Sequence, residues 1–324
     1  MDLAVIIPAL NERDALPGLV DEIDRACEKL EPPVEWEVLV VDDGSTDRTF
    51  EMVEDLAITN DRIWAIRLRR NFGKSAALAV GFDATDADVV ITIDGDGQDD
   101  PADIPLLLDK MKEGEGVDLV SGWKRDRQDP ASRRIASKLF NWFTAKATGV
   151  DMHDMNCGFK AYAGDCARSV DVYGEMHRFM PALAVQQGWR VAEVPVNHRA
   201  REHGKSRFGL ERYLRGALDL VTVVFLGRYQ FRPLHLFGGA GAAFTLLGTL
   251  ICLYLTILKI GGESIGDRPL LFLGVLLIVV GVQLLTLGLL AQMQVLTRRE
   301  FAGSDLERGR IDRVLEPNPV EEKV

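Results

Sequence analysis

Residues 89–98 read Val89-Val90-Ile91-Thr92-Ile93-Asp94-Gly95-Asp96-Gly97-Gln98, so an apolar run leads directly into acidic and amide side chains separated by glycine. The apolar half is typical of a buried strand. Because side chains repeat every second residue along a strand, we expect Asp94, Asp96 and Gln98 to point the same way. Their oxygens suit Mg²⁺ or Mn²⁺. The stretch therefore predicts a metal site that binds a diphosphate, although an ordinary acidic turn has a similar composition.

Short apolar runs alternate with helical patterns through the first 120 residues, and this alternation predicts a mostly parallel sheet flanked by helices. In open α/β sheets, ligands bind beyond the carboxyl ends of the strands. The runs cover residues 3–7, 36–41, 63–68, 89–93 and 117–121.

Three polar clusters follow these runs at the edge where ligands bind. They are Pro8-Ala9-Leu10-Asn11-Glu12, Asp42-Asp43 and Asp94-Gly95-Asp96. Independent acidic turns have no reason to converge on one edge of a sheet. We therefore expect a single site there.

The composition sets the broad class of protein. With 324 residues, the chain has room for one large domain and an appendage, or for two domains. A net charge of -11 argues against nucleic acid as the main partner. The four cysteines form no CxxC pair and fit a reducing cytoplasm, and a strand-like start leaves no room for a signal peptide.

Two stretches near the C-terminus, residues 234–258 and 270–296, contain no Asp, Glu, Lys or Arg. Each exceeds the roughly 20 residues that cross a bilayer as a helix, so we expect two transmembrane helices rather than buried core helices. Arginines flank the pair on both outer sides, which places both long ends in the cytoplasm by the positive-inside rule. Glycine recurs every seventh residue along the second stretch and predicts a helix-packing surface. The glycines are Gly274, Gly281 and Gly288.

Basic side chains are concentrated between the acidic clusters and these helices. We expect a catalytic domain at 1–208, amphipathic juxtamembrane helices at 209–232, two transmembrane helices at 233–297 and a largely disordered cytoplasmic tail at 298–324.

The ordered set of motifs resembles the family 2 glycosyltransferases of GT-A fold, and within them the branch that acts on polyprenyl phosphates. The resemblance covers nearly the whole chain. The chain departs from the family at two positions. Cys157 stands where relatives often have Ser or another small residue, and Gly95 stands in place of the commoner Ala. Neither departure removes a ligand oxygen. The motifs are Ile7-Pro8-Ala9-Leu10-Asn11-Glu12, Val41-Asp42-Asp43-Gly44-Ser45, Arg70-Asn71-Phe72-Gly73-Lys74, Asp94-Gly95-Asp96-Gly97-Gln98-Asp99, Asn156-Cys157-Gly158-Phe159-Lys160 and Arg201-Glu202-His203-Gly204-Lys205-Ser206-Arg207.

The resemblance implies roles for single residues. The nucleotide is expected at Pro8, Ala9, Glu12 and Asp42, and the metal at Asp94, Asp96 and Gln98, with Asp96 also counted as catalytic. Arg201, Ser206 and Arg207 are expected at the phosphates. From the same motifs we include Asn11, Asp43 and Lys74 among the substrate-binding residues.

The implied reaction is inverting transfer of a sugar from a nucleotide-sugar, with UDP-glucose the leading expectation, to a polyprenyl phosphate. A formamido-arabinose transferase and a GDP-mannose-dependent synthase are the alternatives. We expect a multi-pass enzyme of the inner (plasma) membrane, active on the cytoplasmic side and dependent on Mg²⁺ or Mn²⁺. Relatives in this branch also suggest a homo-oligomer, specifically a tetramer.

The acceptor phosphate needs cations rather than a strong base, because its second pKa is about 6 and it is already largely dianionic. Arginine forks match phosphate geometry, so Arg125 and Arg133 are candidates beside the favoured Arg201 and Arg207. Asp154 is a candidate for orienting the acceptor or acting as a weak base, with a structural turn as the alternative.

Three other functions are compatible with parts of this sequence. Leu68 stands where a P-loop needs its first glycine, which excludes an NTPase. A processive polysaccharide synthase would need a Gln-x-x-Arg-Trp motif, and residues 186–190 have the wrong order. A silent, membrane-anchored nucleotide-sugar binder remains as an alternative of another class.

Overall fold

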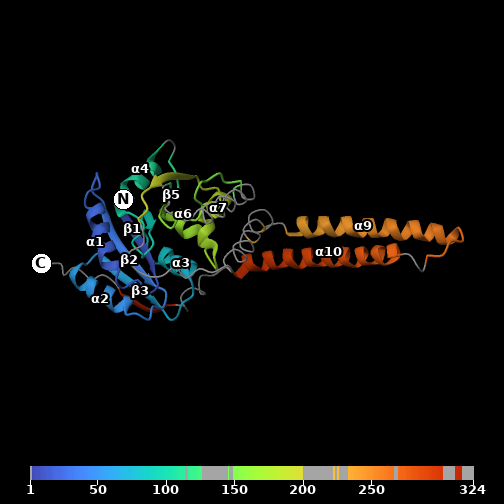
Figure 1. The fold of residues 1–324 in the computed structure, drawn as a ribbon, viewed down its shortest axis with the longest axis horizontal. Helices are drawn as coiled ribbons and strands as arrows, with labels where there is room; N and C mark the ends of the chain where they lie inside the picture. Colours follow the sequence, from blue (N-terminus) through green and yellow to red (C-terminus); the bar gives the residue numbers. More distant parts are fainter. Residues whose placement is uncertain are drawn as a thin grey trace. The chain divides into compact units, whose positions relative to one another are not determined.

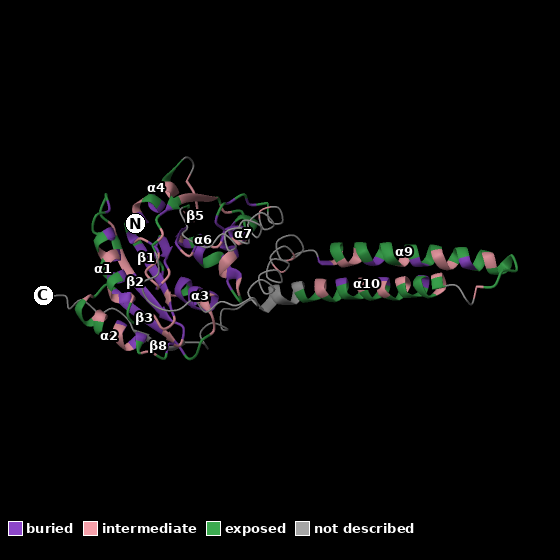
Figure 2. Cartoon of the chain, viewed as in Figure 1, coloured by how far each residue is buried: buried purple, intermediate pink, exposed green. Residues whose placement is uncertain are grey.

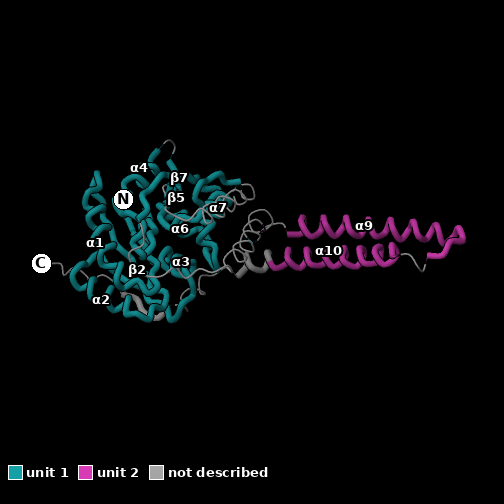
Figure 3. The backbone as a smooth tube through the Cα atoms, in the orientation of Figure 1, with its two compact units in different colours: residues 1–223, 304–324 teal, residues 224–303 magenta. Residues whose placement is uncertain are grey.

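The computed structural model describes residues 2–113, 116–125, 145, 149–199, 222, 225, 233–265, 269–301 and 311–315. The described elements fall into two compact units (Figure 3). Unit 1 comprises residues 1–223 with 304–324, and unit 2 comprises residues 224–303.

Unit 1 is built on an eight-stranded mixed sheet of order β7-β5-β6-β4-β1-β2-β3-β8 (Figure 1). Six strands run in one direction, and β6 and β8 run against their neighbours. The strands are β1 (Asp2–Ala9), β2 (Glu35–Asp42), β3 (Ile63–Leu68), β4 (Val89–Thr92), β5 (Leu119–Lys124), β6 (Lys160–Ala163), β7 (Val191–Val196) and β8 (Ile311–Leu315).

Helices cover both faces of this sheet. One hydrophobic cluster joins alternate β1 residues such as Val5 to α1, α2 and α4, and a second joins Ile6 to α3, α6 and α7. Neighbouring strand residues therefore bury opposite faces, as expected of a sheet between two helical layers. The helices are α1 (Leu16–Cys27), α2 (Thr49–Thr59), α3 (Lys74–Ala84), α4 (Ile104–Lys112), α6 (Gly164–Ser169) and α7 (Met180–Gln186), with 3₁₀ turns η1 (Pro101–Asp103) and η2 (Met176–Phe179).

The five strands expected from the sequence are all present, and three further strands were missed. β6 and β7 are short, with four and six residues. β8 lies inside the tail that we expected to be largely disordered, where it pairs antiparallel with β3.

Unit 2 contains two long apolar helices, α9 (Pro233–Ile260) and α10 (Pro269–Phe301). By length and composition, Pro233–Ile260 and Pro269–Gln294 could each cross a membrane. Most of their side chains are exposed or half-buried (Figure 2), as apolar residues facing lipid would be.

Glycines form the contact between α9 and α10. A Cβ atom added at Gly281 would lie 2.7 Å from the Gly241 carbonyl oxygen, and one at Gly274 would lie 2.9 Å from Cys252 Sγ. The small residues let the two backbones approach closely. The packing surface predicted from the seven-residue spacing of the glycines is therefore confirmed.

Candidate active site

The carboxyl ends of β1, β2 and β4 lie side by side at one edge of the sheet. β1 lies between β2 and β4, and Ala9 pairs with Asp42 in register. A Cβ atom added at Gly95 would lie 3.5 Å from the Pro8 carbonyl oxygen and 3.6 Å from Glu12 Cγ. The three polar clusters therefore meet, as the sequence predicts.

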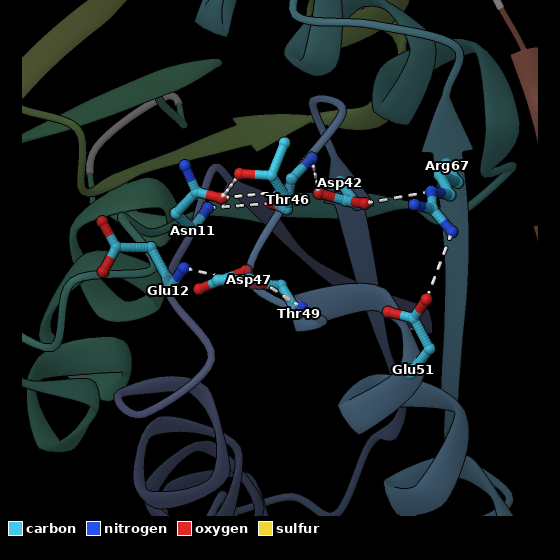
Figure 4. Close-up of polar contacts among 9 residues, drawn as sticks. Asn11, Glu12, Asp42, Thr46, Asp47, Thr49, Glu51 and Arg67 are labelled. Carbon is cyan, nitrogen blue, oxygen red and sulfur yellow. Dashed lines mark hydrogen bonds and ion pairs between the residues drawn. The ribbon is translucent and has the colours of Figure 1, made fainter.

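The loops after β1 and β2 are joined by hydrogen bonds (Figure 4). The Asn11 backbone N–H donates to Ser45 Oγ at 2.8 Å, and Thr46 N–H donates to Asn11 Oδ1 at 2.8 Å. Glu12 N–H donates to Thr49 Oγ1 at 3.2 Å. These bonds fix Asn11 and Glu12 against the β2 loop and use the Asn11 side chain as an acceptor within the protein.

The two aspartates after β2 are buried. Asp42 Oδ1 accepts from Ser45 N–H at 2.9 Å, and Arg67 Nε lies 3.7 Å from Oδ2, which accepts no hydrogen bond from any described residue. Asp43 accepts from the backbone N–H groups of Phe72 and Gly73 at 2.7 and 2.9 Å. Burial raises the pKa of both carboxyls, and these hydrogen bonds oppose the rise.

Asp43 brings the β3–α3 loop onto the β2 loop, and Gly44 makes the approach possible. Gly44 has φ +73°, and a Cβ atom there would lie only 2.5 Å from the Arg70 carbonyl carbon. Any other residue at position 44 would separate the loops. The contact places Lys74, the first residue of α3, at the same sheet edge.

The residues after β4 form a turn and not a continuation of the strand. β4 ends at Thr92, Gly97 has φ +69°, and Gln98 N–H donates to Asp96 Oδ1 at 3.2 Å. The strand alternation that we expected to align Asp94, Asp96 and Gln98 does not reach them, because β4 ends at Thr92. The three side chains instead share one tight loop.

Asp94 forms an ion pair with Lys74, and 33% of its side chain is exposed. Burial alone would raise the pKa of Asp94, but Lys74 and Lys124 outweigh burial and hold that pKa well below its usual range. On its inner side, Asp94 lies against Gly158, where an added Cβ atom would lie 2.5 Å from Asp94 Oδ1. Asp94 is thus a carboxylate at neutral pH.

The donor set at this loop fits a divalent cation only in part. Among the described residues, no group of three or more His, Cys, Asp and Glu side chains could hold a metal. Asp94, Asp96 and Gln98 offer two carboxylates and one amide. Mg²⁺ is commonly held by one or two carboxylates together with substrate phosphates, so these residues fit a cation shared with a diphosphate.

A buried charge network lies behind residues 94–98, the expected metal loop, and the sequence did not predict it. Asp99 is fully buried, with Lys124 Nζ 2.6 Å and His198 Nδ1 3.6 Å from its Oδ1. Asp99 directly follows Gln98, so its place in the acidic motif was a signal that could have revealed it. No pattern in the sequence marks Lys124 or His198 as its partners.

A second missed group surrounds the Asn156–Lys160 motif. Lys160 is 2% exposed and donates to the Cys157 carbonyl oxygen, and burial, with Lys74 nearby, lowers the pKa of Lys160 to about 8. Burial raises the pKa of Cys157 to about 12, so this thiol stays protonated. Asp154 is 4% exposed, which limits direct contact with an acceptor and fits a structural turn better.

His177 in η2 reaches the start of α3. Its Nδ1 lies 2.9 Å from Ser75 Oγ, and its backbone N–H donates to the same oxygen at 3.1 Å. Burial, Lys74 and Arg178 lower the pKa of His177 well below its usual value. A neutral imidazole therefore holds the turn beside Lys74.

Of the arginines expected at the phosphates, the structure describes Arg125. Arg125 is exposed directly after β5, at the same edge of the sheet as the metal loop. Arg133, Arg201, Ser206 and Arg207 lie outside the described residues, as does most of the expected amphipathic segment at 209–232.

Comparison with known proteins gives the family. The sequence model described as Glycosyl transferase family 2 matches residues 4–167. Dodecaprenyl-phosphate galacturonate synthase of Rhizobium johnstonii is 40% identical over 303 residues, covering 90% of this chain and 87% of that protein. Undecaprenyl-phosphate 4-deoxy-4-formamido-L-arabinose transferase of Aeromonas hydrophila is 34% identical, with 90% and 87% covered. The chain belongs to glycosyltransferase family 2 and is an enzyme of that class.

Solved structures agree on the fold. Mannosyl-3-phosphoglycerate synthase from Rubrobacter xylanophilus aligns with a TM-score of 0.53 at 21% identity, over 69% of this chain and 73% of that one. Glucosyl-3-phosphoglycerate synthase from Mycobacterium tuberculosis, crystallised with Mn²⁺, UDP and phosphoglyceric acid, gives 0.51 at 20% identity, over 69% and 78%. The sheet unit has the GT-A fold that the motifs predict.

Proposed function

We propose that this enzyme transfers a sugar, with inversion, from a nucleotide-sugar to a polyprenyl phosphate at the membrane surface. The observation that carries the proposal is the meeting of the three polar clusters at one sheet edge, in a chain that also has two apolar helices long enough to cross a bilayer. Two relatives named for polyprenyl-phosphate substrates, each aligned over 90% of this chain, support it.

The loops after β1 and β2 are proposed to hold the nucleotide. Asp42 Oδ2 supports this role, because it is buried and accepts no hydrogen bond from the described residues. An N–H donor on a nucleobase could satisfy that oxygen. Pro8, Ala9, Glu12 and Asn11 are proposed to line the same side of the site.

The diphosphate is proposed to lie over the loop of Asp94, Asp96 and Gln98. When bound there, Mg²⁺ or Mn²⁺ would supply Lewis-acid neutralisation of the leaving diphosphate. Lys74 adds a cation from the N-terminus of α3, a helix end that itself favours anions. These groups oppose the charge that builds up as the sugar leaves.

The acceptor phosphate carries its own nucleophilic oxygen, so the site needs orientation more than proton removal. Arg125, Arg133, Arg201, Ser206 and Arg207 are proposed to hold it. The buried Asp154 is better suited to supporting the loop that carries Gly158.

The two apolar helices are proposed to keep the site at the level of the lipid headgroups, because a polyprenyl chain does not leave the bilayer. The orientation with unit 1 in the cytoplasm rests on the arginines that flank the helices. Assembly into a tetramer is still a prediction from the family resemblance alone.

A panel of donors tests the proposal. Purified protein would be incubated with Mn²⁺, a short polyprenyl phosphate and labelled UDP-glucose, UDP-galacturonate, UDP-formamido-arabinose or GDP-mannose, and the lipid fraction would be counted. We expect one donor to give lipid-linked sugar far above the others. Metal-dependent donor binding with no lipid-linked product from any donor would instead favour the silent binder.

A further inference from the structure

The three residues that follow β7 contact the segment that follows β4 one after another. The backbone N–H and Nδ2 of Asn197 donate to the Asp103 carboxylate at 2.6 and 3.0 Å. The backbone N–H of Arg199 donates to the Gln98 carbonyl oxygen at 2.8 Å. Residues 197–199 therefore contact the chain from the metal loop to η1.

Asp99 lies at the centre of these contacts. Its backbone bridges to His198, and its carboxylate is fully buried between His198 and Lys124. Lys124 is the last residue of β5, and only 10% of its side chain is exposed. One carboxylate thus joins the end of β5, the segment after β7 and the metal loop.

The same contacts orient Gln98. Its Nε2 donates to the Arg199 carbonyl oxygen at 3.3 Å. Because the amide nitrogen is engaged there, the amide oxygen is the atom left to face a cation. The Gln98 amide is therefore held by Arg199, a residue outside the acidic motif.

We propose that Asp99 is a positioning residue, which acts through Lys124 and His198 to fix the loop that carries Asp96 and Gln98. The inference rests on the proposed function, because the metal ligands are those proposed above. Outer groups that orient metal ligands typically change metal affinity by about 10–100-fold when they are removed.

Binding of Mn²⁺ in the presence of UDP tests this inference without measuring turnover. Free Mn²⁺ would be followed by electron paramagnetic resonance with the full chain in detergent. We expect Asp99→Asn to raise the Kd for Mn²⁺ by about 10-fold or more, because it breaks the ion pair with Lys124. His198→Ala, which leaves that ion pair intact, should raise the Kd by a smaller factor.

Asp118→Asn is the matched control. Asp118 accepts from the Arg190 backbone N–H at 2.8 Å, and the pair lies at the starts of β5 and β7, opposite to the Asp99 network. It joins the same two strands, so its loss reports general destabilisation. We expect the Asp118→Asn protein to bind Mn²⁺ as the wild type does.

Asp96→Asn separates the two levels of the proposal. If it abolishes Mn²⁺ binding while Asp99→Asn and His198→Ala leave the Kd unchanged, the positioning role is overturned and the metal site stands. If Asp96→Asn binds Mn²⁺ with the wild-type Kd, the metal site and the positioning role are both overturned. Should Asp99→Asn fail to fold, an unchanged Kd in His198→Ala alone overturns the inference.

Discussion

Lys160 carries an ammonium group into the interior of unit 1, where it donates to the Cys157 carbonyl oxygen and interacts with Asp94 and Asp154. A buried cation is costly unless charges and hydrogen bonds compensate it. The lowered pKa of Lys160, about 8, shows that burial and the nearby Lys74 outweigh the two carboxylates.

This pKa makes stability depend on pH in a defined direction. Below about pH 8, Lys160 is protonated in the folded and unfolded states alike. Between about pH 8 and its usual 10.5, the unfolded chain binds the extra proton, so stability rises with pH. We expect the melting temperature of wild type, relative to Lys160→Met, to be flat from pH 6 to 7.5 and to rise above pH 8.

Lys29→Met, at an exposed position, controls for the loss of a lysine as such. Taking the difference between wild type and variant cancels the other titrating groups, including the buried thiols. A difference that stays constant or falls above pH 8 would show that Lys160 is not held in the way described.

The position of a single residue could be predicted where the residue belongs to a motif that directly follows a strand. The sequence is sufficient to bring Glu12, Asp42 and Asp94 to one edge, because each follows a strand of the same sheet. Lys124 and Lys160 were not predictable, because a lysine in a short strand gives no sign of being buried. Their partners are distant in the chain and are brought close only by β5, β6 and β7.

Among the elements, α9 and α10 follow most directly from composition, and their contact depends on glycine. An added Cβ at Gly241 would lie 2.6 Å from the Gly281 carbonyl oxygen, whereas one at Gly239 meets nothing within 4 Å. The two glycines lie two residues apart on one helix, so they form a matched pair.

We expect Gly241→Leu to weaken the α9–α10 pairing by about 1–3 kcal/mol, because the side chain forces the backbones apart. Gly239→Leu should have little effect. The midpoint of SDS-induced loss of helicity in micelles measures both. Equal midpoints for the two variants would contradict the glycine contact.

β8 is an element that the composition of the sequence did not predict. The tail around it is rich in charged residues, yet residues 311–315 pair with β3 at the edge of the sheet. An edge strand left bare exposes unpaired backbone groups. The sequence did not predict this pairing, because a five-residue strand far along the chain from its partner leaves no periodic pattern.

Deleting residues 304–324 should therefore lower the melting temperature of unit 1 and promote aggregation through β3. Deleting residues 316–324 removes the end of the tail and keeps β8, so it should melt like the full chain. The comparison by differential scanning fluorimetry in detergent would contradict the β8 pairing if both deletions behaved alike.

In the whole molecule, the two units are formed by successive parts of the chain, with the tail as an exception. Residues 1–223 build the sheet and the site, residues 224–303 hold the apolar helices, and residues 304–324 return to the sheet unit. The sequence predicted an apolar pair after a catalytic domain, but not that the tail rejoins the first unit. The fold class followed from the alternating pattern, whereas the antiparallel strands needed tertiary information.

The central claim is that a cation at Asp94 and Asp96 serves transfer to a lipid phosphate. Formation of polyprenyl-phosphate sugar by wild type, Asp96→Asn and the exposed control Asp86→Asn, with the best donor and Mn²⁺, tests it most directly. A metal supplies several kcal/mol of charge stabilisation, so we expect Asp96→Asn to fall by about 100-fold or more while melting normally. Asp86→Asn should match wild type. Unchanged lipid product from a folded Asp96→Asn protein would contradict the claim.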